Sequence, residues 1–185
     1  AQQKRKGRVE WGLSCETMRL NDEARARGVD ATLDQDPDTA SSTTIHAALL
    51  PKGALEGGLK DTIARIKDAS LRPKMKAEVA QILLTERGGG DPRNVAISFC
   101  DWDSSLAGKN LADIAVMRGL TPTLENAAEV TLWIVENGSC GGIFHAIGEE
   151  DVVRVMAHPA TMIVSDGGGG PFGVGAPDPR AYGTW

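Results

Sequence analysis

Apolar residues recur at helical spacing through the middle of this chain, at positions that fit two successive helix faces. The first face carries Leu59, Ile63 and Ile66, and the second carries Met75, Val79, Ile82 and Leu83. Pro73 suits the first turn of the second helix, where its missing N–H has no helical partner. Glycines at 88–90 followed by Asp91 and Pro92 predict that the helix stops in a turn. We interpret residues 51–92 as a helical insertion.

Capping residues and apolar periodicity predict four further helices. The expected helices cover residues 14–28, 110–118, 121–137 and 149–158. Ser14 is the expected N-cap of the first helix and Gly28 its end. Thr121 and Pro122 are the expected N-cap and first residue of the third helix, which Gly138 ends.

Short apolar runs predict strands at 29–33, 95–100, 142–147 and 161–164. Strands and helices alternate from residue 95 onward, which favours an α/β fold with a parallel sheet. The 161–164 run, which lies between Pro159 and a glycine cluster, is expected to be a buried strand. It ends in Ser165-Asp166-Gly167, so a carboxylate follows the strand at the end where parallel α/β folds place their chemistry.

The composition is that of an ordinary globular domain and excludes several function classes. The chain has 185 residues, 41% of them hydrophobic, and a net charge of -5. Its basic residues cluster only at 4–6, so we expect no nucleic-acid binding. No apolar run is long enough for a membrane span or a secretory signal. Cys15, Cys100 and Cys140 are odd in number and far apart, which predicts reduced thiols in a cytoplasmic protein.

Several local motifs suggest other chemistry but lack its full pattern. Asp34, Asp36 and Asp38 imitate the start of a calcium loop, yet its glycine and final glutamate are missing, so a polar turn is favoured. The glycines of 168–173 match a dinucleotide motif, but prolines prevent the helix that should follow. Cys140 beside glycines could be a nucleophile, although a structural thiol is the default.

The three histidines do not form a metal-binding pattern. His46, His145 and His158 show no i, i+4 pair and no H-x-H motif, and none is near a cysteine in sequence. His145, which lies among apolar residues, is expected to be a hydrogen-bonded core histidine. His158 is expected at a helix end, near terminal carbonyls. We therefore assign no metal ligand within this chain.

A series of segments occurs along the chain in an order and spacing that are specific when taken together. They are the helix at 14–28, the Asp-Gln-Asp-Pro-Asp-Thr-Ala segment from Asp34, Asp101-Trp102-Asp103, the helices from Leu111 and Glu149, Ser165-Asp166-Gly167 and Pro179-Arg180. Through these segments most of the chain resembles the N-acyl-D-amino-acid deacylase (D-aminoacylase) family of metal-dependent amidohydrolases. The chain departs from the family at three positions. Asp36 and Asp38 stand where the family usually has tyrosines, and Asp178 stands where it usually has histidine.

The resemblance implies the C-terminal part of a (β/α)8 TIM-barrel amidohydrolase, with residues 1–185 as a partial barrel domain. It implies zinc, held mostly on strands that would precede residue 1, and so an isolated chain without activity. Asp166 would be the catalytic carboxylate, and Arg180 would bind the substrate carboxylate. Ser42 could hydrogen-bond the substrate, whereas the charge of Asp36 would oppose substrate binding.

The expected partner is therefore a small N-acyl-amino-acid substrate, together with a missing barrel half or a second copy of the chain. An alternative is that the chain is a non-catalytic module that serves structure or interaction. The changes at Asp36, Asp38 and Asp178 and the missing metal ligands favour this alternative.

Overall fold

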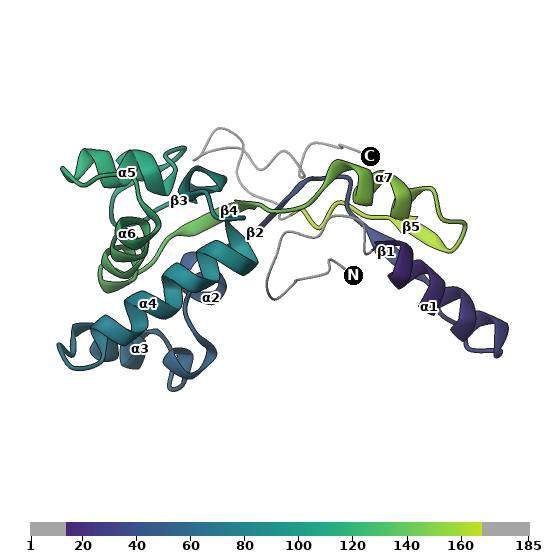
Figure 1. The fold of residues 1–185 in the computed structure, drawn as a ribbon, viewed down its shortest axis with the longest axis horizontal. Helices are drawn as coiled ribbons and strands as arrows, with labels where there is room; N and C mark the ends of the chain where they lie inside the picture. Colours follow the sequence, from purple (N-terminus) through teal and green to yellow (C-terminus); the bar gives the residue numbers. More distant parts are fainter. Residues whose placement is uncertain (1–13, 168–185) are drawn as a thin grey trace. The chain divides into compact units, whose positions relative to one another are not determined.

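The computed structural model describes residues 14–167 and shows helices combined with small sheets in a mixed α/β arrangement (Figure 1). The α-helices are α1 (Ser14–Ala26), α2 (Ile45–Leu49), α3 (Leu59–Lys67), α4 (Arg72–Ile82), α5 (Leu111–Met117), α6 (Leu124–Glu136) and α7 (Glu149–Met156). The strands are β1 (Leu33–Gln35), β2 (Ala40–Thr44), β3 (Val95–Phe99), β4 (Gly141–His145) and β5 (Thr161–Ile163). Shorter turns of helix are η1 (Lys52–Leu55), η2 (Leu83–Arg87), η3 (Pro92–Asn94) and η4 (Ser104–Leu106).

The chain divides into two units, one of residues 1–40 with 147–185 and the other of residues 41–146. In the first unit, α1 begins at Ser14 and ends before Gly28, whose φ of 84° is a left-handed conformation that glycine adopts without strain. The Ser14 hydroxyl donates to Asp151 of α7 and accepts a 2.7 Å hydrogen bond from Arg154. These bonds attach α1 to α7.

The strands of this first unit differ in two ways from the sequence prediction. The strand expected at 29–33 is wrong, because β1 begins only at Leu33 and the side chain of Val29 is exposed. The β5 strand lies where it was expected, but its predicted burial is wrong. Met162 and Ile163 are 56% and 41% exposed. Two strands alone pair here, so the described residues leave much of β5 uncovered.

The second unit is built around α6, which packs against α2, α3, α4 and α5. The predicted apolar face of α6 is confirmed, since its buried residues include Ala127, Ala128, Thr131, Leu132 and Val135. Burial of the Thr131 hydroxyl is compensated by a 2.8 Å bond to the Ala127 carbonyl. Gly138, at φ 118°, follows the helix as predicted.

The start of α5 agrees with the prediction, whereas α6 begins later than predicted. Asn110 caps α5 reciprocally with Asp113, and Gly119 follows its end at φ 72°. The predicted N-cap Thr121 of α6 is wrong, because Thr123 accepts the Asn126 N–H and the helix begins at Leu124. The Thr121 hydroxyl instead accepts from the Asn126 side chain.

The helices α3 and α4 occupy the stretch where two helices were predicted. Ile66, Met75 and Val79 are buried in the core of the second unit, which confirms the apolar faces. The glycine-rich turn after them is present, with Gly90 at φ 84°. That these helices are an insertion, with limits at 51 and 92, stays a prediction.

The parallel sheet predicted from residue 95 onward is wrong for the strands that flank α5 and α6. The strands β3 and β4 pair antiparallel, with Val95 opposite Phe144 and Ile97 opposite Gly142. One crossover helix returns a chain to the end where its first strand began, which gives parallel neighbours. Here two helices, α5 and α6, lie between the strands, so the connection is not a single crossover helix. The strand β2 completes this sheet beside β4.

The prediction of reduced thiols is wrong for two of the three cysteines. Cys100 and Cys140 form a disulfide, while Cys15 is free and exposed. The cysteine argument for a cytoplasmic location therefore fails, and that location stays a prediction without this support. Within residues 14–167, none of the helices is long and apolar enough to span a membrane.

A cluster of charged side chains joins α4 to α6. Arg72 donates to Glu129 at 2.5 Å and also to Glu136, while the Lys76 ammonium lies 3.2 Å from Glu129. Burial by itself would raise the pKa of Glu129. The hydrogen bonds and charges of Arg72 and Lys76 outweigh this effect and hold the pKa below its ordinary value of 4.5.

We expect Glu129→Gln to lower the free energy of unfolding by about 1 kcal/mol at pH 7. A lowered carboxylate pKa contributes stability that is present above the unfolded-state pKa and lost as the pH falls through the folded-state pKa. The difference between wild type and variant should therefore shrink below about pH 4.5, as measured by urea unfolding.

A matched control is Glu78→Gln, because Glu78 lies at 4.0 Å from Lys74 in an exposed pair. The free energy of unfolding of Glu78→Gln should equal that of wild type both at pH 7 and below about pH 4.5. Equal stability of Glu129→Gln and wild type at pH 7 would show that the cluster contributes nothing.

Candidate active site

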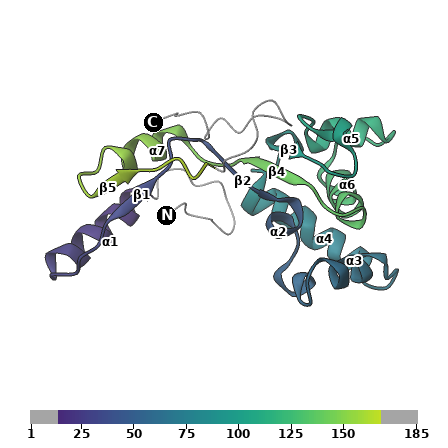
Figure 2. The ribbon, with the colours of Figure 1, turned by 180° about the vertical axis from the view of Figure 1, so that it is seen from behind.

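The candidate site lies where the parallel strands β1 and β5 end. Leu33 pairs with Thr161 and Gln35 with Ile163, and the Val164 N–H continues the ladder by donating to the Gln35 carbonyl at 3.1 Å. Both views of the molecule show the two strands side by side (Figures 1 and 2). Since parallel strands have their carboxyl ends at one edge, the residues that follow β1 and β5 leave the sheet at the same edge.

Asp36 is the first residue after β1, and it is only 5% exposed. Its Oδ1 accepts the Asp38 N–H at 3.0 Å, which forms a side-chain turn around Pro37. The buried Gln35 side chain donates to the Asp36 carbonyl at 2.7 Å. The polar turn that the sequence favours at this place is therefore present, and it holds Asp36 inward.

Asp166 lies three residues beyond β5 and is exposed. Its φ of 50° is left-handed, a conformation that aspartate and asparagine adopt more readily than most residues. The Ser165 hydroxyl accepts the Gly167 N–H at 3.2 Å, so a short turn surrounds Asp166. The turn places Asp166 at the strand end, and its predicted role as the catalytic carboxylate stays a prediction.

The other two candidate residues lie outside the described part of the first unit. Ser42 is an exposed residue of β2 and belongs to the second unit. Arg180 lies outside the described residues, as do Asp178 and the glycine-rich motif at 168–173. Their predicted roles therefore stay predictions.

The histidines occupy three separate environments. His46 Nδ1 lies 2.9 Å from the Ser139 hydroxyl, and burial lowers the pKa of its ring. His158 Nε2 lies 3.0 Å from Asp22 Oδ1, and its Nδ1 accepts the Ala160 N–H. The prediction that His145 belongs to the core is wrong, because it is exposed at the end of β4.

These positions do not make a metal centre. Between residues 14 and 167, no three histidine, cysteine, aspartate or glutamate side chains are gathered closely enough to hold a metal ion. The described part of the chain therefore does not fit the zinc that the resemblance implies.

Sequence reasoning missed the contribution of Gln35, a buried amide at the last position of β1. It holds the carbonyl of Asp36 and shapes the turn that follows. The sequence signal was a glutamine directly before the Asp-Pro-Asp turn, and its burial became known only from the structure. Its partner became evident only once the strand was placed.

Comparison with solved structures finds proteins that are similar over most of this chain. D-aminoacylase matches at a TM-score of 0.52 and 26% identity, over 88% of this chain and 24% of the D-aminoacylase chain. The chain resembles D-aminoacylase. A second D-aminoacylase structure, studied for the functional role of its binuclear metal center, matches at 0.51 and 26% identity.

A further solved structure is similar over the same share of this chain. The N-acyl-D-glutamate deacylase from Bordetella bronchiseptica, complexed with zinc and a phosphonate inhibitor, matches at a TM-score of 0.52 and 24% identity. The matched region covers 88% of this chain and 24% of the deacylase chain. This chain thus spans about a quarter of the length of the D-aminoacylase-type enzymes it resembles. No family model and no curated protein sequence matches it.

Proposed function

We propose that the chain contributes to a hydrolase that cleaves the linear amide bond between an acyl group and a D-amino acid. The observation that carries the proposal is Asp166, presented on an outward turn after a strand that pairs in parallel with β1. The resemblance to D-aminoacylase over 88% of this chain supports it. In this proposal the residues belong to part of a TIM-barrel amidohydrolase.

Asp166 acts as the proton carrier of the reaction. Its ionised carboxylate accepts a proton from the attacking water, and the resulting acid gives that proton to the leaving amine. The turn from Ser165 to Gly167 sets the position of the carboxylate, and its exposure lets water and substrate reach it. Both halves of the transfer use the same two carboxylate oxygens.

We assign no step to a metal ion. The N-acyl-D-glutamate deacylase structure contains zinc, and a D-aminoacylase variant was studied in complex with CuCl2. The residues of this chain at 14–167 offer no matching set of ligands. Zinc stays an implication of the resemblance, and each role in the proposal belongs to a side chain of this chain.

Substrate binding involves Arg180, Ser42 and Asp36 in this proposal. Arg180 pairs with the substrate carboxylate, for which a planar guanidinium is suited. Ser42 is a hydrogen-bond donor to the substrate. Asp36 weakens binding of the substrate carboxylate, since its buried negative charge lies at the strand edge that also carries Asp166.

The proposal is tested by supplying an N-acetyl-D-amino acid to the intact protein that carries residues 1–185 and measuring release of the free amino acid. In that assay we expect Asp36→Asn to lower KM about 5-fold or more, because it removes about 1 kcal/mol or more of repulsion between like charges. The variant keeps the Oδ1 acceptor that bonds the Asp38 N–H, so the turn should persist.

Asp38→Asn is the matched control, because Asp38 belongs to the same turn and the substitution removes the same charge. We expect a smaller change in KM with this control. An unchanged KM for Asp36→Asn would show that Asp36 does not face the substrate carboxylate.

A second function, interaction without catalysis, is favoured by the uncovered side chains of β5. Met162 and Ile163 are successive strand residues and so point to opposite faces, yet both are exposed. A partner that covers this strand would bury them. A sedimentation mass of the intact protein above that of a single copy, together with no turnover, would favour this function over hydrolysis.

A further inference from the structure

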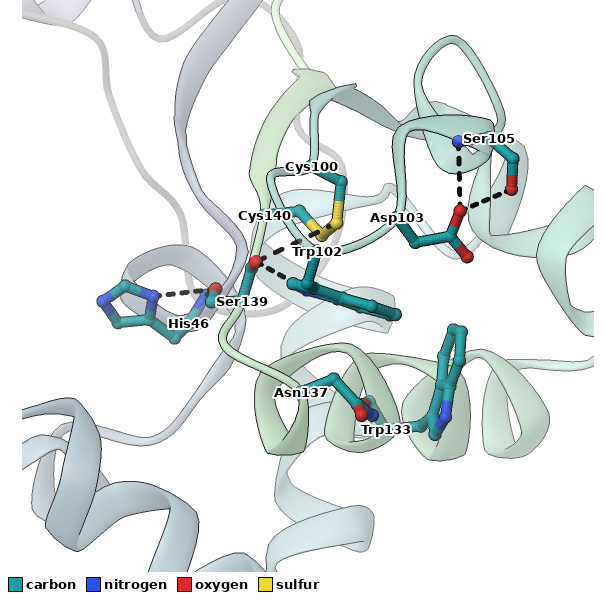
Figure 3. The surroundings of a disulfide bond; sticks show 9 residues. All are labelled: His46, Cys100, Trp102, Asp103, Ser105, Trp133, Asn137, Ser139 and Cys140. Atoms are coloured by element: carbon teal, nitrogen blue, oxygen red, sulfur yellow. Dashed lines mark hydrogen bonds between the residues drawn. A yellow bond between two sulfur atoms is a disulfide. The ribbon is translucent and has the colours of Figure 1, made fainter.

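The disulfide of the second unit joins two chain segments that are already neighbours in a sheet. Cys100 follows β3 and Cys140 precedes β4, directly after the last strand pair, Phe99 with Gly141. Their Cα atoms are 4.5 Å apart, and the residues are 5% and 4% exposed (Figure 3). The cysteines are 40 residues apart in sequence, so the sheet brings them together.

Contacts other than the disulfide also hold the two cysteines side by side. The β3–β4 ladder fixes the residue next to each cysteine, and the Cys140 carbonyl accepts the Ile45 N–H at 2.9 Å. Breaking the sulfur–sulfur bond therefore leaves the two thiols adjacent, which favours formation of the same bond again. This arrangement suits a bond that opens and closes within the folded state.

Ser139, which precedes Cys140, connects the disulfide to its surroundings. Its backbone is left-handed, at φ 68°, and its carbonyl accepts the Trp102 indole N–H at 3.0 Å. The Ser139 carbonyl oxygen lies 4.0 Å from the Cys100 sulfur. Its hydroxyl contacts His46 Nδ1 at 2.9 Å, and Figure 3 shows these groups gathered around the disulfide.

Two tryptophans lie close to this turn, so their fluorescence should depend on its conformation. The ring centroids of Trp102 and Trp133 are 5.1 Å apart, and the rings meet edge to face at 85°. Since Trp102 is tied to the Ser139 carbonyl, a shift of that carbonyl moves Trp102 relative to Trp133. On the other side, His46 lies at the beginning of α2 and contacts the Ser139 hydroxyl.

We propose that Cys100 and Cys140 are a reversible redox switch that sets the conformation of the Ser139 turn. A thiolate of a small dithiol attacks one protein sulfur, the disulfide breaks, and a mixed disulfide forms. The second thiol of the reductant then attacks that mixed disulfide and releases the protein sulfur. The protein gains two electrons and two protons, and the dithiol becomes a cyclic disulfide.

The state of this bond changes what Ser139 can hold. In the oxidised form the bond fixes Cys140, so the Ser139 carbonyl stays on Trp102 and the hydroxyl stays on His46. In the reduced form Cys100 and Cys140 each carry a proton and need more room in a buried place. The turn relaxes, and both contacts of Ser139 loosen.

The first part of the test counts thiols in the intact protein. The protein is unfolded in denaturant, treated with iodoacetamide and weighed by mass spectrometry. Among the three cysteines of residues 1–185, we expect only Cys15 to be alkylated without reductant and all three after dithiothreitol. Alkylation of Cys100 and Cys140 without reductant in air-exposed protein would overturn the proposal, because the bond would not form in solution.

The second part measures tryptophan emission of the folded protein before reduction, after dithiothreitol and after reoxidation. We expect a shift in intensity on reduction that reverses on reoxidation, in wild type and in the matched control Cys15→Ser. The shift should be lost in Cys100→Ser and, independently, in Cys140→Ala. Identical emission in both redox states of wild type, or a change that does not reverse, would overturn the switch.

Discussion

Asp166→Asn is expected to lower kcat for hydrolysis of an N-acetyl-D-amino acid by about 100-fold or more. The substitution keeps the size and shape of the side chain but removes the group that accepts and returns the proton. Asparagine also adopts left-handed backbone readily, so the turn with φ 50° is not disturbed. KM should change little, because the lost interaction belongs to the transition state.

The matched control is Asp30→Asn, which removes one exposed carboxylate from the same unit away from the strand edge. Its kcat should equal that of wild type. The kinetics are measured on the intact protein that carries residues 1–185, with circular dichroism to compare the folds. An acid–base group is expected to contribute about 100-fold to kcat. A kcat for Asp166→Asn within about 3-fold of wild type would therefore remove Asp166 from the mechanism.

Phe144→Ala is expected to lower the free energy of unfolding by about 3–5 kcal/mol. Phe144 is fully buried in β4, opposite Val95, and a side-chain atom added at Gly142 would lie 2.8 Å from its ring. The Arg87 guanidinium lies 5.7 Å from the ring centroid. Removing the ring leaves a cavity that this close packing cannot fill.

Urea unfolding of Phe144→Leu provides a milder second variant, expected to lose less than about 1.5 kcal/mol. The matched control is Val116→Ala, because Val116 is 60% exposed, and it should stay within about 0.5 kcal/mol of wild type. A loss below about 1 kcal/mol for Phe144→Ala would contradict the close packing around β4.

Helices were predictable where caps and apolar spacing agreed. Asn110 with Asp113, and the glycines at 119 and 138, determine helix ends through neighbours in sequence, so these limits could be predicted. The start of α6 was two residues later than expected because Thr121 and Thr123 both contact Asn126. Only the geometry shows which threonine receives a backbone N–H.

Features that depend on distant residues could not be predicted. The direction of β4 depends on the path of two helices, and the pairing of Cys100 with Cys140 depends on that direction. The exposure of Met162 and Ile163 depends on which elements pack against β5. Apolar runs in the sequence do not show strand direction, disulfide pairing or which strand residues are covered.

The candidate site shows the same division. The turn that presents Asp166 was predictable from Ser165-Asp166-Gly167, because it uses only local bonds. The parallel pairing of β5 with β1, which places Asp36 at the same edge, joins residues more than 100 positions apart in the sequence. The local pattern therefore predicted the turn, and the strand pairing shows that Asp36 and Asp166 follow strands that end at the same edge.

We propose that this chain contributes to the hydrolysis of N-acyl-D-amino acids with Asp166 as proton carrier. The most direct measurement supplies N-acetyl-D- and N-acetyl-L-amino acids separately to the intact protein that carries residues 1–185 and quantifies the free amino acid released. The account predicts release from the D-substrate, little from the L-substrate, and loss of D-release in Asp166→Asn. Release from neither enantiomer, or equal release by wild type and Asp166→Asn, would contradict it.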